Sequence, residues 1–488
     1  MRNTLLPVLC VLAILLLFAS HSAAGQLFVG TATADITPEG PTALHGQFRL
    51  RIANRIETPL AAGVVALESR DGDRTRDLAV MVACDLIVIP NEVRDMVREE
   101  VAKRVPGLDT KKIFIGGTHT HTAPATRPGS FILPDEGVVT IEEYRAFLVG
   151  RLADAIEKAW NNRSPGSVTW GLGHAVVAYN RRAVYADGSA RMYGATNVPE
   201  FRGIEGYEDH SVNTLFFWNA EDELIAVCIT VPSPSQVVEG RSTINADFWY
   251  PVYEALRERY GQDLCILGFC GAAGDQAPRP MFRKEAEARM ARLRGLDAMA
   301  ELARRIVRAV EDTYDVVKSE RRSEVPLVHH VETLQLPMRL VTEAEYAQSK
   351  AAQQNAAEAI AQDPQAADRH HTAMNWHGRT VERFEAQKDD PKPMHEMQMH
   401  VLRIGDAVVC TNQFELFTDY GIQIQARSKA VQTIVVQLVG DGTYLPTERA
   451  VRGGSYSAIV QSSRVGPEGG HVLVDKTVEA IDAVFVEE

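Results

Sequence analysis

The chain has few cysteines, and their spacing follows no pattern. Six of its 488 residues are cysteine, and one of these, Cys10, lies in an apolar N-terminal segment. The other five are an odd, sparse set, which argues against the disulfide framework of a small secreted domain. We expect them to be small buried hydrophobic side chains, with a bridge between Cys265 and Cys270 as the alternative.

An excess of positive charge is also missing. The chain has 51 Lys and Arg residues against 64 Asp and Glu, which gives a formal net charge of −13. A surface of this sign repels phosphate backbones and anionic lipid headgroups, so nucleic acid and anionic membrane are disfavoured as bulk partners. After residue 24, no apolar run reaches the length of about 18 residues that a membrane-spanning helix needs. No integral membrane segment is therefore expected in the mature chain.

The N-terminal segment has the layout of a secretory signal peptide. Arg2 supplies a positive start, residues 5–18 form an apolar core, and the small residues 22–24 form a cleavage site. This pattern predicts a signal peptide over residues 1–24 and a secreted or periplasmic mature chain over residues 25–488.

Linkers rich in Gly, Pro and Ser are absent from the remainder, and so are internal repeats. Apolar runs alternate with stretches of helical periodicity, which predicts an α/β fold with layered mixed β-sheets and flanking helices. We expect a single large domain with a polar helical excursion at about residues 342–388. Strands are predicted over residues 26–38, 78–90, 113–115, 168–177, 224–231, 264–269, 399–411 and 431–439. Helices are predicted over 92–104, 140–161, 247–260, 285–316 and from about 475.

Two histidines follow the apolar run at residues 113–115. His119 and His121 are one residue apart, and in an extended backbone their side chains would lie on the same side. Two neighbouring imidazoles are typical of a metal site, or of a base with its orienting partner. The alternative is a pair of hydrogen-bonded structural histidines.

Other polar residues at predicted strand ends allow two interpretations each. Asp247 is interpreted as a helix cap in preference to a catalytic group, and Asp275 fits turn geometry and a site equally well. Arg181 and Arg182 pair with surface acids or bind a substrate carboxylate, phosphate or sulfate. The remaining residues also have structural interpretations without a functional role. Glu415 would pair with an Arg, and Tyr456 would pack in a turn. The histidines of the excursion would be solvated; they are His370, His371 and His377.

Several loops together resemble the neutral/alkaline non-lysosomal ceramidase family, over nearly the whole mature chain. The most specific match is residues 117–124, Gly-Thr-His-Thr-His-Thr-Ala-Pro, which is similar to the family's Thr-His-Thr-His-Ser-Gly-Pro loop. Further matches follow in the same chain order as in the family. They are residues 35–38, Asn180-Arg181-Arg182, Asn245-Ala246-Asp247, residues 274–278, Phe414-Glu415, residues 444–447 and residues 453–456.

The resemblance implies a zinc ion in a catalytic pocket. By motif, His119 and Glu415 would be ligands, and Tyr456 would be a third, with looser support because the loop lengths differ. His121 would act beside the metal as an orienting or proton-handling group. Asp275 and Arg181 complete the candidate catalytic set.

Two departures from the family pattern change the expected chemistry. Ser233 stands where the second ligand histidine is expected, and Ala277 replaces the serine of the Gly-Asp-x-Ser-Pro motif. A neutral hydroxyl is a poor zinc ligand, so zinc affinity should fall and preference should move towards harder ions such as calcium or magnesium. A serine role at residue 277 is lost.

The resemblance implies a metal-dependent hydrolase that cleaves an N-acyl amide or related bond of a small-molecule or lipid-like substrate through a metal-activated water. The departures count against true ceramidase activity. One alternative is a hydrolase of a glycan or glycolipid. The other is a catalytically degenerate binding protein that keeps the fold.

Overall fold

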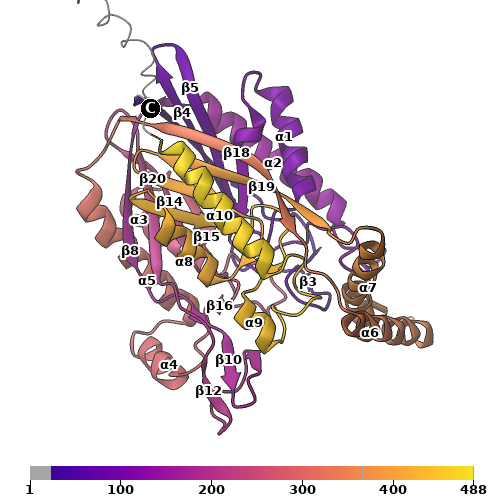
Figure 1. The fold of residues 1–488 in the computed structure, drawn as a ribbon. Coiled ribbons are helices and arrows are strands. Elements are labelled where there is room, and N and C mark those ends of the chain that lie inside the picture. The colour runs from indigo at the N-terminus through magenta and orange to yellow at the C-terminus, as the bar shows by residue number, and fades with distance from the viewer. Residues whose placement is uncertain (1–23, 364–366, 487–488) are drawn as a thin grey trace, which may run out of the picture.

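The computed structural model describes residues 24–363 and 367–486. The predicted signal peptide falls almost entirely on residues 1–23, which lie outside the described residues. Three sheets and their covering helices make up the body (Figure 1). In the part of the chain that the structure describes, none of the helices combines the length and apolar character needed to cross a bilayer.

The first sheet has the strand order β17-β1-β4-β5-β6, with β7 paired to β1. Strands β1, β4 and β5 are antiparallel neighbours, and β6 runs parallel to β5. Helices α1 and α2 cover one face, and α2 begins with the predicted capping box at Thr140. The bounds are β1 Gly25–Asp35, β4 Ala61–Asp71, β5 Arg74–Cys84, β6 Ile113–Gly117, β7 Ser164–Pro165, β17 Glu324–Val325, α1 Asn91–Arg104 and α2 Ile141–Asn161.

The second sheet has the order β15-β14-β13-β8, and β15 runs parallel to β14. Helices α3 and α5 pack on its outer face through a cluster that includes Phe216, Trp249 and Ile306. The bounds are β8 Ser167–His174, β13 Ser211–Trp218, β14 Leu224–Val231, β15 Cys265–Cys270, α3 Trp249–Tyr260, α4 Lys284–Leu293 and α5 Ala298–Val317.

The third sheet has the order β18-β19-β20-β22, and helices α8 and α10 cover it (Figure 1). Strand β22 runs parallel to β20. The bounds are β18 Leu327–Pro337, β19 Met394–Ile404, β20 Ala407–Thr411, β22 Gln432–Val436, α8 Thr418–Arg427, α9 Glu448–Gly453 and α10 Pro467–Val484. The short elements are β2 Thr42–Ala43, β3 Ile52–Ala53, η1 Thr110–Lys112, β9 Tyr179–Asn180, β10 Arg182–Tyr185, β11 Ala190–Met192, β12 Phe201–Ile204, β16 Gln276–Ala277, β21 Glu415–Leu416 and β23 Tyr444–Leu445.

One apolar core lies between the three sheets. It joins Phe114 of the first sheet, Phe269 of the second, and Leu402 and Val436 of the third. A single core shared by all three sheets makes this one domain, so the predicted layered α/β fold is confirmed. The five described cysteines are free and buried, which confirms their interpretation as small hydrophobic side chains and rules out the Cys265–Cys270 bridge.

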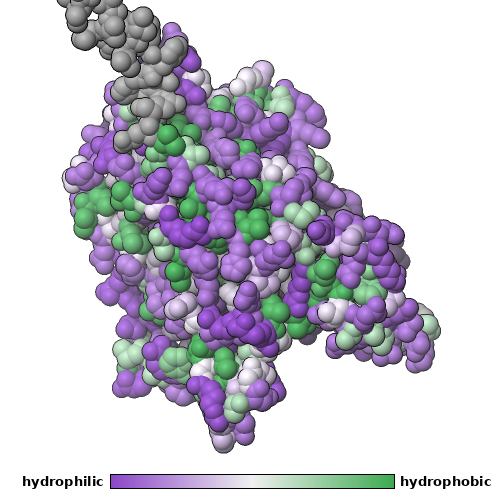
Figure 2. All heavy atoms as spheres, viewed as in Figure 1, coloured by the Kyte–Doolittle hydropathy of each residue, from purple (hydrophilic) through white to green (hydrophobic). Residues whose placement is uncertain are grey.

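The polar excursion forms a helical hairpin of α6 (Glu343–Gln362) and α7 (Ala367–Asp389), inserted between β18 and β19. It projects to one side of the body (Figure 1). Figure 2 shows this region as part of a surface on which hydrophobic side chains are scattered among hydrophilic ones. The helical insertion predicted at about residues 342–388 is therefore confirmed.

Several predicted boundaries were wrong, each for a local reason. The strand predicted over 78–90 ends at Cys84, because Asp85 accepts a hydrogen bond from the Ala61 backbone and the chain then turns. The helix predicted over 285–316 is two helices, α4 and α5, separated by Gly295 at φ 69°. The strand predicted over 399–411 is the hairpin of β19 and β20, and the last helix begins at Pro467 instead of about residue 475.

Candidate active site

Loops that follow four strands meet at one place in the structure. His119 and His121 follow β6, Gln236 follows β14, Gly274 follows β15, and Glu415 follows β20. Gly274 donates its backbone N–H to Leu416, and its Cα packs so closely against the Glu415 carbonyl that a side chain would overlap it. The loop after β15 therefore needs glycine here to hold the Glu415 segment in place.

The two histidines come together by a mechanism that differs from the predicted one. His119 has φ 64°, so the backbone turns there and is not extended. Its N–H donates to the Leu86 carbonyl, which fixes this turn. The Nε2 atoms of His119 and His121 are 3.4 Å apart, and the rings are nearly perpendicular. The prediction that the pair lies together is confirmed, but its explanation from strand alternation was wrong.

The proton position on His119 follows from its neighbours. Nδ1 lies 2.8 Å from the Ile87 carbonyl, which can only accept, so Nδ1 carries the hydrogen. In the neutral imidazole, Nε2 then presents a lone pair, and Glu415 Oε2 lies 3.4 Å from it. A buried lone pair that faces a carboxylate only 18% exposed is unfavourable unless a proton or a cation lies between them.

His121 belongs to a hydrogen-bonded chain that starts at Arg181. Arg181 Nη1 donates to Gln236 Oε1 at 3.3 Å, which fixes the amide orientation. The Gln236 amide nitrogen then donates to His121 Nε2 at 2.6 Å, so the hydrogen of His121 is on Nδ1. Burial, and next the neighbouring His119 and Arg51, hold the pKa of His121 well below its usual value. His121 is therefore neutral at physiological pH.

Arg181 is buried in this cluster, and its guanidinium is held on several sides. Nη2 donates to Gly274 O at 2.9 Å and to the Tyr444 hydroxyl at 3.2 Å, and it lies 3.9 Å from Glu415 Oε2. Arg182, the other member of the predicted pair, instead forms a buried ion pair with Glu205. The structure thus separates two arginines that were equivalent in the sequence.

Glu415 and Tyr444 are partners in the parallel pair β21–β23. Burial alone would raise the pKa of Glu415, but His119, Arg181 and a hydrogen bond from Tyr444 overcome it and lower that pKa. Burial raises the pKa of Tyr444 well above its usual value, so its hydroxyl keeps its proton. Tyr444 was not among the predicted ligands, although it lies in one of the family-like loops, at residues 444–447.

Tyr456 lies one ring further out. Its ring centroid is 5.5 Å from that of Tyr444. Burial, followed by the Glu415 charge, raises the pKa of Tyr456 to about 12. The predicted ligand Tyr456 thus packs against Tyr444, which hydrogen-bonds to Glu415.

Asp275 lies behind the cluster and uses both carboxylate oxygens there. Oδ1 accepts from the backbone N–H and the hydroxyl of Thr418, and Oδ2 accepts from the Asn180 amide. Burial raises the pKa of Asp275 to about 6 despite these donors. Its observed contacts join β9 to α8, so they position the Arg181 segment from behind.

The other predicted positions have local roles. Ser233 is buried and donates to the Pro234 carbonyl, and Ala277 is buried in the β16–β9 pair. Asp247 has φ 55° and accepts from the Val238 and Phe248 backbone N–H groups. It fixes the loop after β14, but it is not the N-cap of α3.

The helical insertion brings Trp376 against Tyr456 beside the cluster, a contact that the sequence did not predict. The ring centroid of Trp376, in α7, lies 6.2 Å from that of Tyr456 and 5.4 Å from that of Phe48. The Phe48 and Tyr456 centroids are 5.8 Å apart. His371, one of the three histidines expected to be solvated, forms a hydrogen bond with Asn375 instead. The helix looked polar in the sequence because one aromatic residue among polar neighbours gives no apolar stripe.

Two of the three predicted metal ligands, His119 and Glu415, come together in the structure. Two ligand atoms about 2.1 Å from a tetrahedral zinc lie roughly 3.4 Å apart, and this is the His119–Glu415 separation. His119 also makes the carbonyl contact that zinc-binding histidines usually make through the other ring nitrogen. Within residues 24–363 and 367–486, no group of three or more His, Cys, Asp and Glu side chains is arranged for a metal. The remaining positions would be filled by a phenol or water.

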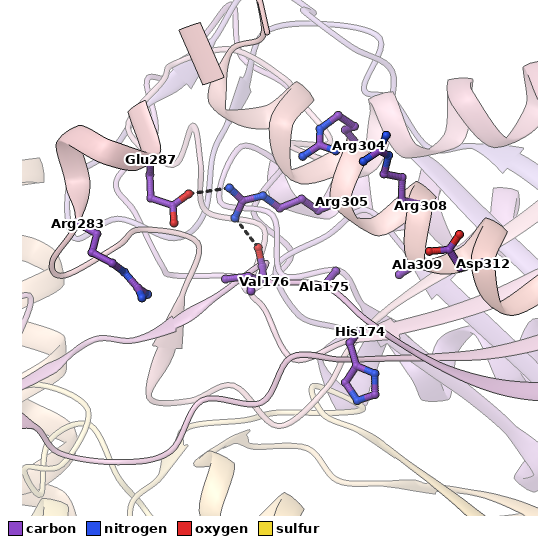
Figure 3. Close-up of a pocket in the computed structure, with 10 residues that line it drawn as sticks. All are labelled: His174, Ala175, Val176, Arg283, Glu287, Arg304, Arg305, Arg308, Ala309 and Asp312. Carbon is purple, nitrogen blue, oxygen red and sulfur yellow. Dashed lines mark hydrogen bonds and ion pairs between the residues drawn. The ribbon is translucent and has the colours of Figure 1, made fainter. Parts of the chain in front are cut away.

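A groove of about 500 Å³ lies away from this cluster, between the end of β8 and helices α4 and α5 (Figure 3). Its central guanidinium, Arg305, is bonded to Glu287 and to the Val176 carbonyl. None of the residues predicted for the site lines this groove. Size alone therefore does not identify the candidate site.

Known proteins resemble this chain only at the level of structure. No family model matches it, and no curated protein matches it by sequence. A neutral ceramidase from Pseudomonas aeruginosa has a TM-score of 0.65 at 18% identity, over 95% of this chain and 76% of that one. A ceramidase complexed with C2 has a TM-score of 0.65 at 16% identity, over 94% and 75% of the two chains. These similarities establish a ceramidase-like fold.

Proposed function

We propose that this chain is a metal-dependent hydrolase that cleaves an N-acyl amide or a related bond. The observation that carries the proposal is the His119 ring, which is anchored by a backbone carbonyl and whose Nε2 lies 3.4 Å from the Glu415 carboxylate. The similarity in fold to two ceramidases supports the choice of bond.

His119 and Glu415 would hold the metal, and Tyr444 or Tyr456 would supply the phenol position. Zinc is the first candidate, and Ser233 in place of a second ligand imidazole favours replacement by a harder divalent ion. A bound zinc lowers the pKa of its water to about 7 and polarises a carbonyl.

The chain's own groups suit a reaction in which negative charge develops on a carbonyl oxygen. Arg181 is a permanent cation held rigidly beside Glu415, so it would stabilise that charge with little reorganisation. Tyr444 remains protonated and can donate a hydrogen bond. His121 is kept neutral beside the cluster and accepts through Nε2, so the amide of Gln236 orients it.

The substrate class and the location are part of the same proposal. The aromatic rings of Phe48 and Tyr456 beside the cluster suit an apolar segment such as an acyl chain. The N-terminal pattern at residues 1–24 supports export of the protein.

Two substitutions favour a second candidate, a binding protein that has lost catalysis. Ser233 is bonded to its own loop, and Ala277 has no hydroxyl. A degenerate site would still bind an amide ligand but would not turn it over.

Turnover of short N-acyl amides by the mature chain, with and without a chelator, distinguishes the candidates. The proposal expects turnover that the chelator abolishes and that added zinc, calcium or magnesium restores. Chelator-resistant turnover contradicts the metal role. Ligand binding without turnover under every metal condition contradicts the hydrolase and supports the binding protein.

A further inference from the structure

A small cavity of about 90 Å³ lies between α7 and the loops that carry His45 and Arg127. Since one water molecule occupies about 30 Å³ of liquid, the space holds a compact group of a few heavy atoms. It is too small for an acyl chain of ordinary length. The residues that line it include His45, Arg127, Phe131, Thr372, Trp376 and Arg379.

The cavity borders the candidate active site on two sides. His45 is followed by Gly46, whose Cα packs directly against the His121 ring. Trp376 contacts Tyr456, which in turn lies beside Tyr444. A substrate held at His119 and Glu415 would therefore reach the cavity with its neighbouring part.

Positive charge is concentrated here, on a chain whose net charge is −13. Arg127 and Arg379 line the cavity, and Arg464 lies close enough to both for mutual repulsion. Asp441 Oδ1 lies 3.3 Å from Arg127 Nη2 and offsets one of these charges. Among the described residues, neither Arg379 nor Arg464 forms an ion pair.

Several polar atoms around the cavity lack partners. His45 Nδ1, Arg127 Nε and Thr372 Oγ1 are buried and make no hydrogen bond within the part of the chain that is described. A buried polar atom that is left unpaired loses its hydration without gaining a partner, which is unfavourable. These atoms come from three separate segments and gather around one cavity, where an oxyanion would accept from the Arg127 and Thr372 groups.

We propose that this cavity is an anion subsite, in which Arg127, Arg379 and Thr372 bind a compact oxyanion of the substrate. The group is a carboxylate, sulfate or phosphate, placed on the part of the substrate opposite its acyl chain. The inference rests on the proposed function for its second half: it makes the preferred substrate an anionic N-acyl amide, which a neutral ceramide is not. Guanidinium groups are well suited to oxyanions because they donate several parallel hydrogen bonds.

Binding by the mature full-length chain tests the subsite separately from catalysis. Calorimetric titrations would compare N-octanoylglycine, which carries a carboxylate, with N-octanoylethanolamine, which is its neutral counterpart. A third ligand, N-octanoyltaurine, distinguishes a tetrahedral oxyanion from a planar carboxylate. Using His119→Ala protein prevents turnover during the titration. We expect one of the anionic ligands to bind about tenfold tighter or more than the neutral one.

The matched variants are Arg379→Gln and Arg369→Gln. Both residues are exposed positions of α7, and only Arg379 lines the cavity. The anion preference should fall to less than about threefold in Arg379→Gln, remain in Arg369→Gln, and weaken as salt is added.

Equal affinity for charged and neutral ligands overturns the subsite, as does absence of binding by all three or an equal loss in both variants. A retained anion preference without turnover by the wild-type chain would contradict the hydrolase and leave the subsite standing. Turnover by the wild-type chain without any anion preference would contradict the subsite and leave the hydrolase standing.

Discussion

Within the described residues, two buried histidine pairs lie in different environments. In one, His119 and His121 have their Nε2 atoms 3.4 Å apart; in the other, His329 Nε2 and His400 Nδ1 are 3.0 Å apart. Each pair has a ring nitrogen beside a backbone carbonyl. Burial lowers the pKa of His121 and of both members of the second pair.

The difference is in what completes the ring nitrogens. In the His329–His400 pair every ring nitrogen has a protein partner within 3.3 Å, and Phe114 packs on both rings. In the other pair, His121 Nδ1 makes no hydrogen bond within the described residues, and His119 Nε2 lies opposite Glu415. A buried histidine pair is therefore uninformative by itself. What distinguishes the His119–His121 pair is that its ring nitrogens lack a full set of hydrogen-bond partners beside a carboxylate and a guanidinium, which favours a catalytic or metal-binding role.

The strongest way to break this comparison is to remove the carboxylate. Glu415→Gln keeps the shape of the side chain but loses its charge, so turnover of an N-acyl amide should fall by about a thousandfold or more. Steady-state rates at saturating metal measure this, with a melting curve to show that the fold persists. Wild-type turnover in a folded Glu415→Gln protein would exclude Glu415 from the site.

The converse change removes His400 from the other pair. His400→Ala leaves a cavity beside Phe114 and an unpaired His329, so the free energy of unfolding should fall by about 2–4 kcal/mol. Turnover per folded molecule should not change. Denaturant unfolding and activity assays check both parts, and a His400→Ala protein that loses activity while fully folded would make the two pairs equivalent.

A subtler change tests the chain of hydrogen bonds from Arg181 to His121. Gln236→Leu keeps the volume but removes both amide contacts, so turnover should fall about 10–100-fold, the usual effect of losing an orienting partner. Bound metal should change little, because His119 and Glu415 are untouched. Metal loss as large as that of His119→Ala would show that Gln236 acts through the metal ligands and not through His121.

The smallest expected effect concerns Asp275. Like the His329–His400 pair, it has protein partners on its polar atoms, so we give it a structural role. Its pKa is about 6 in the folded chain, raised by burial from 3.8. The folded state therefore binds the proton more tightly, and this contribution to stability, present below about pH 4, is lost as the pH rises to about 6. Asp275→Asn should remove about 1–2 kcal/mol of pH dependence across this window. The free energy of unfolding of both proteins is measured between pH 4 and 6. An equal dependence on pH in the two proteins would contradict the raised pKa.

The sequence predicted where polar groups meet better than how they are arranged. Apolar runs ending at Ile115, Val231 and Phe269 placed the loops at strand ends, because uninterrupted hydrophobic stretches identify buried strands. The left-handed turn at His119 was not predictable, since it depends on a tertiary hydrogen bond to Leu86.

Pairings between distant segments were also out of reach. Tyr444 faces Glu415 only because β21 and β23 pair, and nothing local distinguishes it from Tyr456. Trp376 comes to lie beside Tyr456 because α7 packs against a segment 80 residues further along the chain. Such contacts depend on how distant segments pack, which neither propensity nor periodicity encodes.

Calorimetric titration of zinc into chelator-treated protein tests the central claim most directly. The wild-type and His400→Ala proteins should each bind zinc stoichiometrically, whereas His119→Ala should bind at least about a hundredfold more weakly. Calcium and magnesium, titrated in the same way, show whether Ser233 has shifted the preference. If none of the three ions binds the wild type, or if all three proteins bind zinc equally, His119 and Glu415 are not a metal site.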